Sequence, residues 1–116
     1  MPVAAADLDL LQGTLDVMVL KALSWRAMHG FGVAKWIRQT TDDVLQIEDS
    51  ALYPALHRME HRGWIAAEWG LTENNRRAKY YRLTTKGRQQ LRSRVESWER
   101  YTAAVAKVVH ATTQPV

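Results

Sequence analysis

The sequence predicts a mainly α-helical fold with one small β-hairpin and a long C-terminal helix. Three observations predict this fold class. Apolar residues recur every three or four positions over most of the first 62 residues, which is the period of an α-helix. Residues 64–84 alternate loosely instead and are rich in aromatic residues, as strands are. From residue 85 to residue 111 the helical period returns.

The composition is that of one ordinary globular domain with an additional element. The chain has 116 residues, of which 47% are hydrophobic and 24% are charged. It has no cysteine, which excludes disulfides and thiolate metal sites. No apolar run approaches the roughly 20 residues that cross a bilayer, and the N-terminus lacks a signal-peptide pattern. We therefore expect a cytoplasmic protein with no membrane partner.

The net charge of +4 is modest, but the charges are unevenly distributed. Residues 74–95 contain eight of the sixteen basic residues and no acidic residue. Such a segment indicates either a polyanionic partner or a surface that is balanced by acidic residues elsewhere. The eight bases are Arg76, Arg77, Lys79, Arg82, Lys86, Arg88, Arg92 and Arg94.

Two helices are predicted before residue 42, after a flexible tail over residues 1–7. The first runs from Asp9 to about Trp25, with Thr14 and Asp16 on or near its polar side. Residues 26–30 form a connector. The second helix runs from about residue 32 to 41; it buries Val33, Trp36 and Ile37 and exposes Lys35 and Arg38.

A third helix follows, and its two faces differ. Asp49 or Ser50 can cap its start, Pro54 falls near the end of the first turn, and Gly63 ends it in a left-handed conformation. The inner face is apolar and consists of Leu52, Ala55, Leu56 and Met59. The outer face is either a solvated surface or a binding surface, and it carries Ser50, Tyr53, Pro54, His57 and His61.

The alternating segment predicts a hairpin. Residues 64–70 and 79–84 are its strands, and residues 71–78 are a polar turn with Asn-Asn at the tip. A two-stranded ribbon is stable in water only when it is packed on something, here the three helices. Two short helices followed by a basic hairpin predict a winged helix-turn-helix over residues 8–84, in which the hairpin is the wing.

The last helix is predicted over residues 85–111, and residues 112–116 form a second flexible tail. At 1.5 Å per residue this helix is about 40 Å long, too long for the preceding domain to cover. Its apolar residues are spaced four and three apart, as in a coiled-coil seam. The seam packs either on a second copy or on the first helix of its own chain. The predicted dimerisation residues are Leu91, Val95, Trp98, Thr102, Val105 and Val109.

The chain resembles the PadR family of bacterial transcriptional repressors over roughly residues 8–110, and within it the compact subgroup with a single C-terminal helix. The segments that carry the resemblance are Leu11-Gln-Gly-Thr-Leu-Asp16, His29-Gly-Phe-Gly32, Ser50-Ala-Leu-Tyr-Pro-Ala-Leu-His-Arg-Met-Glu60, Gly63-Trp-Ile65, Arg76-Arg-Ala-Lys-Tyr-Tyr-Arg-Leu-Thr84 with Gly87, and Glu96-Ser-Trp98. Met59 stands where a leucine is usual. The resemblance implies a homodimer that represses transcription by binding a pseudo-palindromic operator in double-stranded DNA.

On this interpretation the third helix enters the major groove, and the wing contacts the phosphate backbone or the minor groove. Arg58 is a further candidate, or else pairs with an acid such as Glu60 or one on the first helix, and Tyr53 alternatively closes the core. Tyr80 and Tyr81 alternate in direction, so that one packs inward. The residues expected to contact DNA are Ser50, Tyr53, Pro54, His57, Arg58, Arg76, Arg77, Lys79 and Tyr80, with Thr14, Gly30 and Lys35 at the edges.

The resemblance also implies that some members respond to planar aromatic, drug-like effectors. Trp98 lies in the middle of the seam, and its indole is a good stacking surface for such a compound. We expect an effector site of Trp98, Val95 and Leu15; the alternative is that the two indoles fill the dimer core. No cofactor is expected.

Two other functions are weighed against a regulator. His57 to His61 fit the zinc-hydrolase pattern H-x-x-E-H, but no third ligand lies nearby in the sequence, so we expect no metal site and no enzyme. The other alternative is an effector-independent winged helix that binds DNA with weak specificity or contacts proteins. Such a module would bind operator and random DNA with similar affinity.

Overall fold

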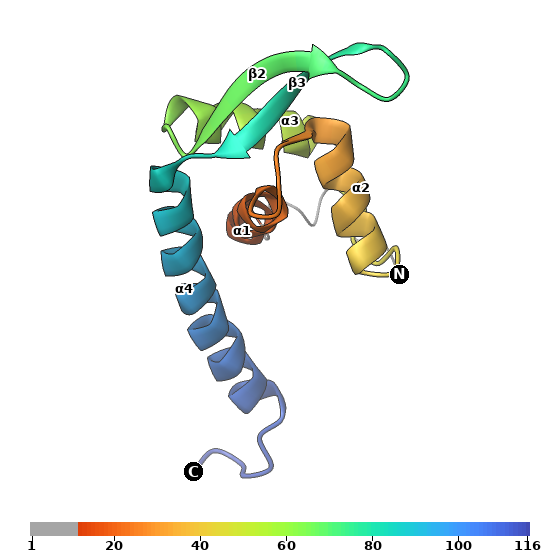
Figure 1. The fold of residues 1–116 in the computed structure, drawn as a ribbon. Helices are drawn as coiled ribbons and strands as arrows, with labels where there is room; N and C mark the ends of the chain where they lie inside the picture. The colour runs from red at the N-terminus through yellow and green to blue at the C-terminus, as the bar shows by residue number, and fades with distance from the viewer. Residues whose placement is uncertain (1–11) are drawn as a thin grey trace.

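The computed structural model describes residues 12–116 and shows the predicted fold class, with four helices and a small antiparallel sheet (Figure 1). The predicted tail over residues 1–7 and the predicted helix start at Asp9 lie outside the described residues. No helix of residues 12–116 has the length and apolar character to span a membrane. The elements are α1 (Gln12–Leu23), β1 (Met28–His29), α2 (Gly30–Thr40), α3 (Asp49–His61), β2 (Ile65–Leu71), β3 (Arg77–Leu83) and α4 (Thr85–Val109).

The core lies between the first three helices and the sheet. Every residue assigned from periodicity to the inner face of α3 is buried, because the three- and four-residue spacing places them on one side. Val33 and Ile37 of α2 are also buried, and Trp36 is half-buried. Together with α1 and the sheet they form one cluster, whose fully buried side chains are Leu20, Ile37, Leu52, Leu56, Met59, Ile65, Val19 and Val33.

The two ends of α3 differ from each other in how well the sequence predicted them. The C-terminal end is confirmed: Gly63 has a φ of 77°, and the N–H of Trp64 donates to the carbonyl of Met59 at 3.0 Å. The predicted cap at the other end is wrong, because Glu48 occupies the cap position and makes no side-chain hydrogen bond there. The helix therefore begins one residue early, and Pro54 lies in its second turn.

The sheet has three strands in the order β1-β3-β2, one strand more than predicted. Met28 pairs with Tyr81 and His29 pairs with Tyr80, which converts the expected connector into an edge strand. Two residues are too few to show an alternating pattern, so the sequence could not reveal β1. The hairpin ladder also extends further than predicted, to the pair Leu71 and Arg77.

Helix α4 projects away from the rest of the molecule, giving dimensions of 62 × 31 × 21 Å (Figure 1). Leu91 in its first half is packed against the core beside α1. Its second half extends beyond the domain, and Trp98, Val105 and Val109 are exposed there. The alternative in which the seam packs wholly on its own chain is therefore wrong for the monomer.

Candidate nucleic-acid interface

The outer face of α3 is a continuous exposed surface without an acidic side chain between Ser50 and His57. Ser50, Pro54 and His57 are exposed, and Tyr53 is 41% exposed. The same helix buries its apolar face, so this polar surface is held on a rigid support. Its width is that of one helix, which the major groove of DNA admits.

Tyr53 is held by the start of α2. A Cβ atom added to Gly30 would lie 2.8 Å from Cε1 and 3.0 Å from the hydroxyl oxygen of Tyr53, closer than atoms can approach. Because glycine has no side chain, position 30 leaves room for the Tyr53 ring against the start of α2. Tyr53 was expected either to contact DNA or to close the core. Its ring packs on the start of α2 while part of the side chain remains exposed, so its position is compatible with both roles.

His29 joins α2 to the wing. Its Nδ1 accepts a hydrogen bond of 3.0 Å from the N–H of Gly32 and so caps the helix. Its ring also packs edge-on against Tyr80, with 5.3 Å between centroids. A single side chain thus connects the start of α2 to β3.

Arg58 is held by an ion pair inside the domain. Its guanidinium hydrogen-bonds to a carboxylate oxygen of Asp16 on α1, and the Asp16 side chain is only 7% exposed. Asp16 was predicted on or near the polar side of the first helix, and that placement is wrong because α3 packs over it. Of the two interpretations for Arg58, the structure has the pairing with an acid of α1.

Lys79, predicted as the first residue of the returning strand, is the third residue of β3. Its Nζ donates to Oε1 of Glu60 on α3 at 3.0 Å, and this hydrogen bond raises the pKa of Lys79. The pair ties the wing to the C-terminal half of α3. The neighbouring Tyr81 is buried, which confirms that one of the two tyrosines packs inward, and this burial raises the pKa of Tyr81.

Two arginines of the wing extend into solvent. Arg76 is in the turn and Arg77 is the first residue of β3; both are exposed, and neither forms an ion pair with any of residues 12–116. The turn is held by a hydrogen bond of 3.1 Å from the N–H of Arg76 to Oγ1 of Thr72. Asn75 has a φ of 59°, a conformation that asparagine tolerates well.

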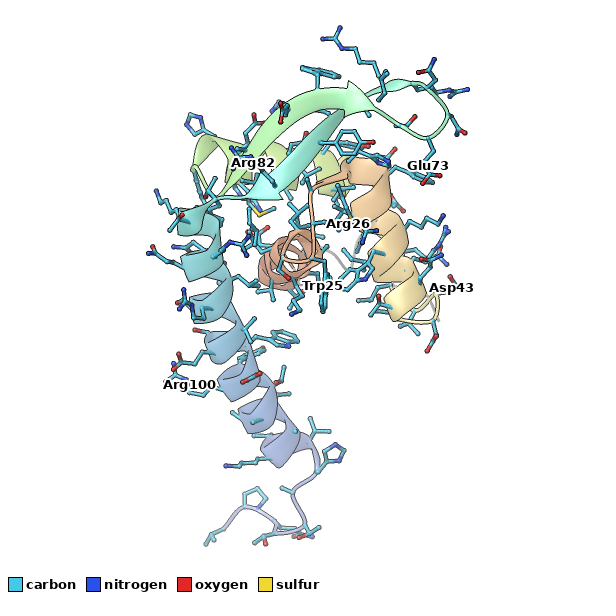
Figure 2. All side chains as sticks on the ribbon, in the orientation of Figure 1. Trp25, Arg26, Asp43, Glu73, Arg82 and Arg100 are labelled. Carbon is cyan, nitrogen blue, oxygen red and sulfur yellow. The ribbon has the colours of Figure 1, made fainter. Side chains whose placement is uncertain are left out.

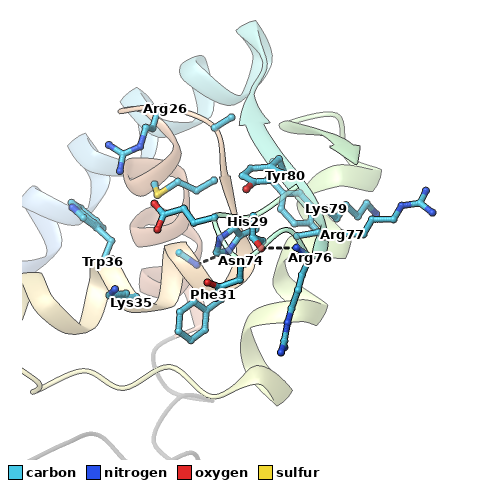
Figure 3. Close-up of a pocket in the computed structure, with 18 of the residues that line it drawn as sticks. Arg26, His29, Phe31, Lys35, Trp36, Asn74, Arg76, Arg77, Lys79 and Tyr80 are labelled. Atoms are coloured by element: carbon cyan, nitrogen blue, oxygen red, sulfur yellow. Dashed lines mark hydrogen bonds between the residues drawn. The ribbon is translucent and has the colours of Figure 1, made fainter. Parts of the chain in front are cut away.

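An open groove of about 820 Å³ separates the wing from α2. Asn74 and Arg76 of the wing tip lie on one side, and Phe31 and Lys35 of α2 lie on the other (Figure 3). Arg26, Tyr53 and Tyr80 also line the groove, so several predicted DNA contacts meet here with a cation from the connector. Thr14 lies elsewhere, partly buried on α1.

The second half of α4 carries an uncovered apolar strip. Its members recur three and four positions apart and include two residues that the predicted seam omitted, Tyr101 and Val108. Val108 is 77% exposed, although removing an apolar side chain from water lowers the free energy of the protein. The exposed members are Trp98, Tyr101, Val105, Val108 and Val109.

A smaller groove of about 400 Å³ lies where this strip approaches α1. Trp98 and Tyr101 line it from α4, and Gly13 and Val17 line it from α1. The ring centroids of Trp98 and Tyr101 are 6.3 Å apart. Leu15, predicted at an effector site with Val95, is instead buried in the core, and neither residue lines this groove.

The residues of the zinc-hydrolase pattern do not form a metal site within residues 12–116. His57 and His61 are exposed on α3, and no group of three His, Cys, Asp or Glu residues suited to a metal ion occurs among residues 12–116. The interface instead has exposed cations, aromatic rings and amide groups, which suit the phosphates, sugars and bases of nucleic acids.

Comparison with known proteins assigns this architecture to a family. Residues 19–93 match the transcriptional regulator PadR-like family. A transcriptional regulator from Clostridium thermocellum is 30% identical, with a TM-score of 0.78 over 90% of this chain and 96% of its own. A PadR family transcriptional regulator from Eggerthella lenta is also 30% identical, with a TM-score of 0.73 over 93% of this chain and 92% of its own.

A protein from Lysinibacillus sphaericus with the name uncharacterized protein X is 29% identical over 90 residues, or 78% of this chain and 83% of its own. The family match covers more than half of the chain and includes α2, α3, the wing and the start of α4. Members of this family are transcriptional regulators and not enzymes. The chain therefore belongs to the PadR-like family of transcriptional regulators and is a DNA-binding regulator.

Proposed function

We propose that this regulator is a homodimeric repressor that binds a pseudo-palindromic operator of bacterial chromosomal DNA in the cytoplasm. One observation carries the proposal: α3 has an exposed face with no acidic side chain between Ser50 and His57, on the same domain as a wing whose arginines form no ion pair within residues 12–116. A helix of this kind reads base edges in the major groove, and cations beside it bind phosphates. We assign residues 12–84 to DNA binding and residues 85–111 to dimerisation.

The contacts divide into two classes. Ser50, Tyr53, Pro54 and His57 on α3 face the major groove and choose the sequence. Arg76, Arg77 and Lys35 bind the backbone and give affinity that depends on salt but little on sequence. Arg58 holds α3 on α1 through its ion pair with Asp16, and Lys79 ties the wing to α3 through its ion pair with Glu60.

The strip on α4 supports the dimer. An exposed apolar strip at coiled-coil spacing is stabilised when a second copy covers it. A two-fold axis through this contact presents two copies of α3 to two half-sites about one turn of DNA apart. The operator is then pseudo-palindromic because the protein is symmetric.

Trp98 is the proposed effector residue, with Tyr101 and Val95 beside it. Two indoles brought near the axis form a stacking surface for a planar aromatic compound. A ligand that changes the separation of the α3 helices needs a coupling free energy of only about 1–3 kcal/mol to weaken operator binding several-fold to a hundredfold. Titration of Trp98 fluorescence with planar aromatics, compared in Trp98→Phe, tests this site directly; unchanged emission across a broad set would leave it a core residue.

The test of the repressor proposal begins with footprinting upstream of the regulator's own gene. The footprinted duplex and a random duplex of equal length are then titrated at several salt concentrations. Tyr53→Ala should weaken operator binding far more than random binding, whereas Arg76→Ala should weaken both and reduce the salt slope by about 0.9 for each subunit, or about 1.8 for the dimer. Equal affinity of the wild-type protein for both duplexes would instead favour the effector-independent, weakly specific module.

A further inference from the structure

The wing carries exposed apolar side chains that its packing does not explain. Residues Ile65, Ala67, Trp69 and Leu71 point to one side of β2, because side chains alternate along a strand. Ile65 is buried and Ala67 packs on the core, but Trp69 is 58% exposed and Leu71 is 65% exposed. The apolar side of β2 therefore continues beyond the core that it covers.

Two cations of β3 share this side of the wing. Lys79 is the cross-strand partner of Trp69, and Arg77 is the partner of Leu71. The Arg77 guanidinium lies over the Trp69 indole, 4.7 Å from the ring centroid. We call Trp69, Leu71 and Arg77 the wing patch.

The wing patch is adjacent to the face of α3. Lys79, on the same side of the hairpin, is hydrogen-bonded to Glu60, and His57 and His61 flank Glu60 on the exposed side of α3. The patch thus continues the proposed DNA-reading surface along the wing. A molecule that binds the wing patch must accommodate the positive charges of Arg77 and the exposed Arg76. These charges lie in a segment, residues 74–95, that contains no acidic residue.

We propose that the wing patch packs on the sugar–phosphate backbone of DNA beside the segment that α3 reads. This inference rests on the proposed function of α3. The Trp69 indole and Leu71 would cover the apolar edges of deoxyribose. The planar guanidinium of Arg77 lies over the indole with one face, so the N–H groups at its edge would still donate hydrogen bonds to a phosphate. The wing then binds through an aromatic and aliphatic surface as well as through charge.

DNA is a better occupant than a protein for two reasons. A stable protein interface needs about 800 Å² from each partner, which two apolar side chains on a narrow hairpin do not provide. Arg76 and Arg77 beside them also form no ion pair within residues 12–116, which leaves both cations for a polyanion. Sugars and phosphates are present at every base pair, so this contact is independent of sequence.

The experiment compares two exposed tryptophans that each have a cation over the ring. Trp25 is 63% exposed with the Lys21 ammonium 4.9 Å from its centroid, and it points away from the wing (Figure 2). We expect Trp69→Ala to weaken binding to operator and random duplexes alike, by roughly tenfold, with an unchanged salt slope. Trp25→Ala should bind as the wild type does, and Arg77→Ala should lower the slope by about 0.9 for each subunit, or about 1.8 for the dimer.

A second measurement is independent of any loss of folding in the alanine variant. DNA should quench more of the tryptophan emission in the wild type than in Trp69→Phe, which keeps a ring at this position. The inference is overturned if Trp69→Ala and Trp25→Ala both bind as the wild type does while Tyr53→Ala still loses the operator. It is also overturned if Trp69→Ala changes self-association and not DNA binding. If Tyr53→Ala also leaves the operator affinity unchanged, the proposed function of α3 itself fails.

Discussion

At the scale of single residues, the ion pair of Asp16 and Arg58 determines how α3 is held on α1. Both partners are largely removed from water, with side chains 7% and 27% exposed. Removing one partner of such a pair leaves a charge without its counter-ion in a poorly hydrated site. The pair therefore orients the reading helix from its inner side and leaves Ser50, Tyr53 and His57 outside.

The first prediction concerns this pair. Asp16→Ala and Arg58→Ala should each lower the free energy of unfolding by about 2–4 kcal/mol, and the double variant should lose much less than the sum. Urea denaturation of all three proteins measures the coupling. Arg38→Ala is the matched control, because its pair with Asp43 is exposed and is worth at most about 1 kcal/mol. Additive losses would show that the two side chains do not interact.

The second prediction concerns stability in alkaline solution. The hydrogen bond to Glu60 raises the pKa of Lys79, so its contribution to stability is complete below 10.5, the ordinary pKa of lysine, and is lost as the pH rises through the higher folded-state value. Burial raises the pKa of Tyr81, so the unfolded chain loses that proton first, above pH 10.0. Both effects have the same sign: stability falls as the pH rises above 10.

A spectrophotometric titration of tyrosinate checks the second prediction. Tyr81→Phe should remove an ionisation that occurs above pH 10.0, because burial raises the pKa of Tyr81 in the folded protein. If Tyr81→Phe leaves the titration curve above pH 10.0 unchanged in shape and position, burial does not raise the pKa of Tyr81.

At the scale of elements, β1 links the reading surface to the wing. It pairs with β3 at Tyr80 and Tyr81 and continues directly into α2, whose first residue holds the Tyr53 ring. The start of α2, the wing and α3 are thus joined by direct contacts. This is why residues from three separate segments line the groove of about 820 Å³.

The third prediction concerns the cap of α2. His29→Ala removes the acceptor for the Gly32 N–H and should destabilise the start of the helix by about 0.5–2 kcal/mol. Hydrogen exchange of the Gly32 amide should become faster, while the amides at the centre of α3 remain protected. His29→Asn, which retains a capping oxygen, should restore much of the protection at Gly32; failure to do so would assign the effect to the contact with Tyr80.

At the scale of the whole molecule, α4 gives the chain its elongated shape. The 25-residue helix is about 37 Å long at 1.5 Å per residue, and the domain covers only its first turns. The rest exposes an apolar strip to water, which is unfavourable in a monomer and is typical of a protein–protein interface. A partner copy on that strip completes the groove at Trp98 as well as the pair of reading helices.

The fourth prediction tests the partner copy. Val105→Glu places a charge in the strip and should shift sedimentation from dimer to monomer, weakening operator binding through loss of the second half-site. Ala103→Glu is the matched control, because it is exposed two residues away on the opposite side of the helix and should leave the dimer intact. Equal behaviour of the two variants would place the interface elsewhere.

The local features of this protein were predictable from its sequence. Helix period, strand alternation and glycine chemistry act over a few residues, so they predicted α3 with its two faces, the hairpin, the end at Gly63 and the long α4. The polar face of α3 and the exposed wing arginines follow from the same patterns. The cap at Glu48 was missed because several neighbouring polar residues could serve and the sequence does not rank them.

Only the tertiary structure decided which candidate cations form ion pairs within the domain. Arg58 and Asp16 are 42 positions apart, Lys79 and Glu60 are 19 apart, and β1 pairs with a strand more than 50 residues later. These partners depend on how the helices cross and on the register of β3, which no local pattern encodes. Arg58 and Lys79 consequently form ion pairs, with side chains 27% and 30% exposed, whereas Arg76 and Arg77 form none within residues 12–116. Trp69 is exposed where its strand extends past the core.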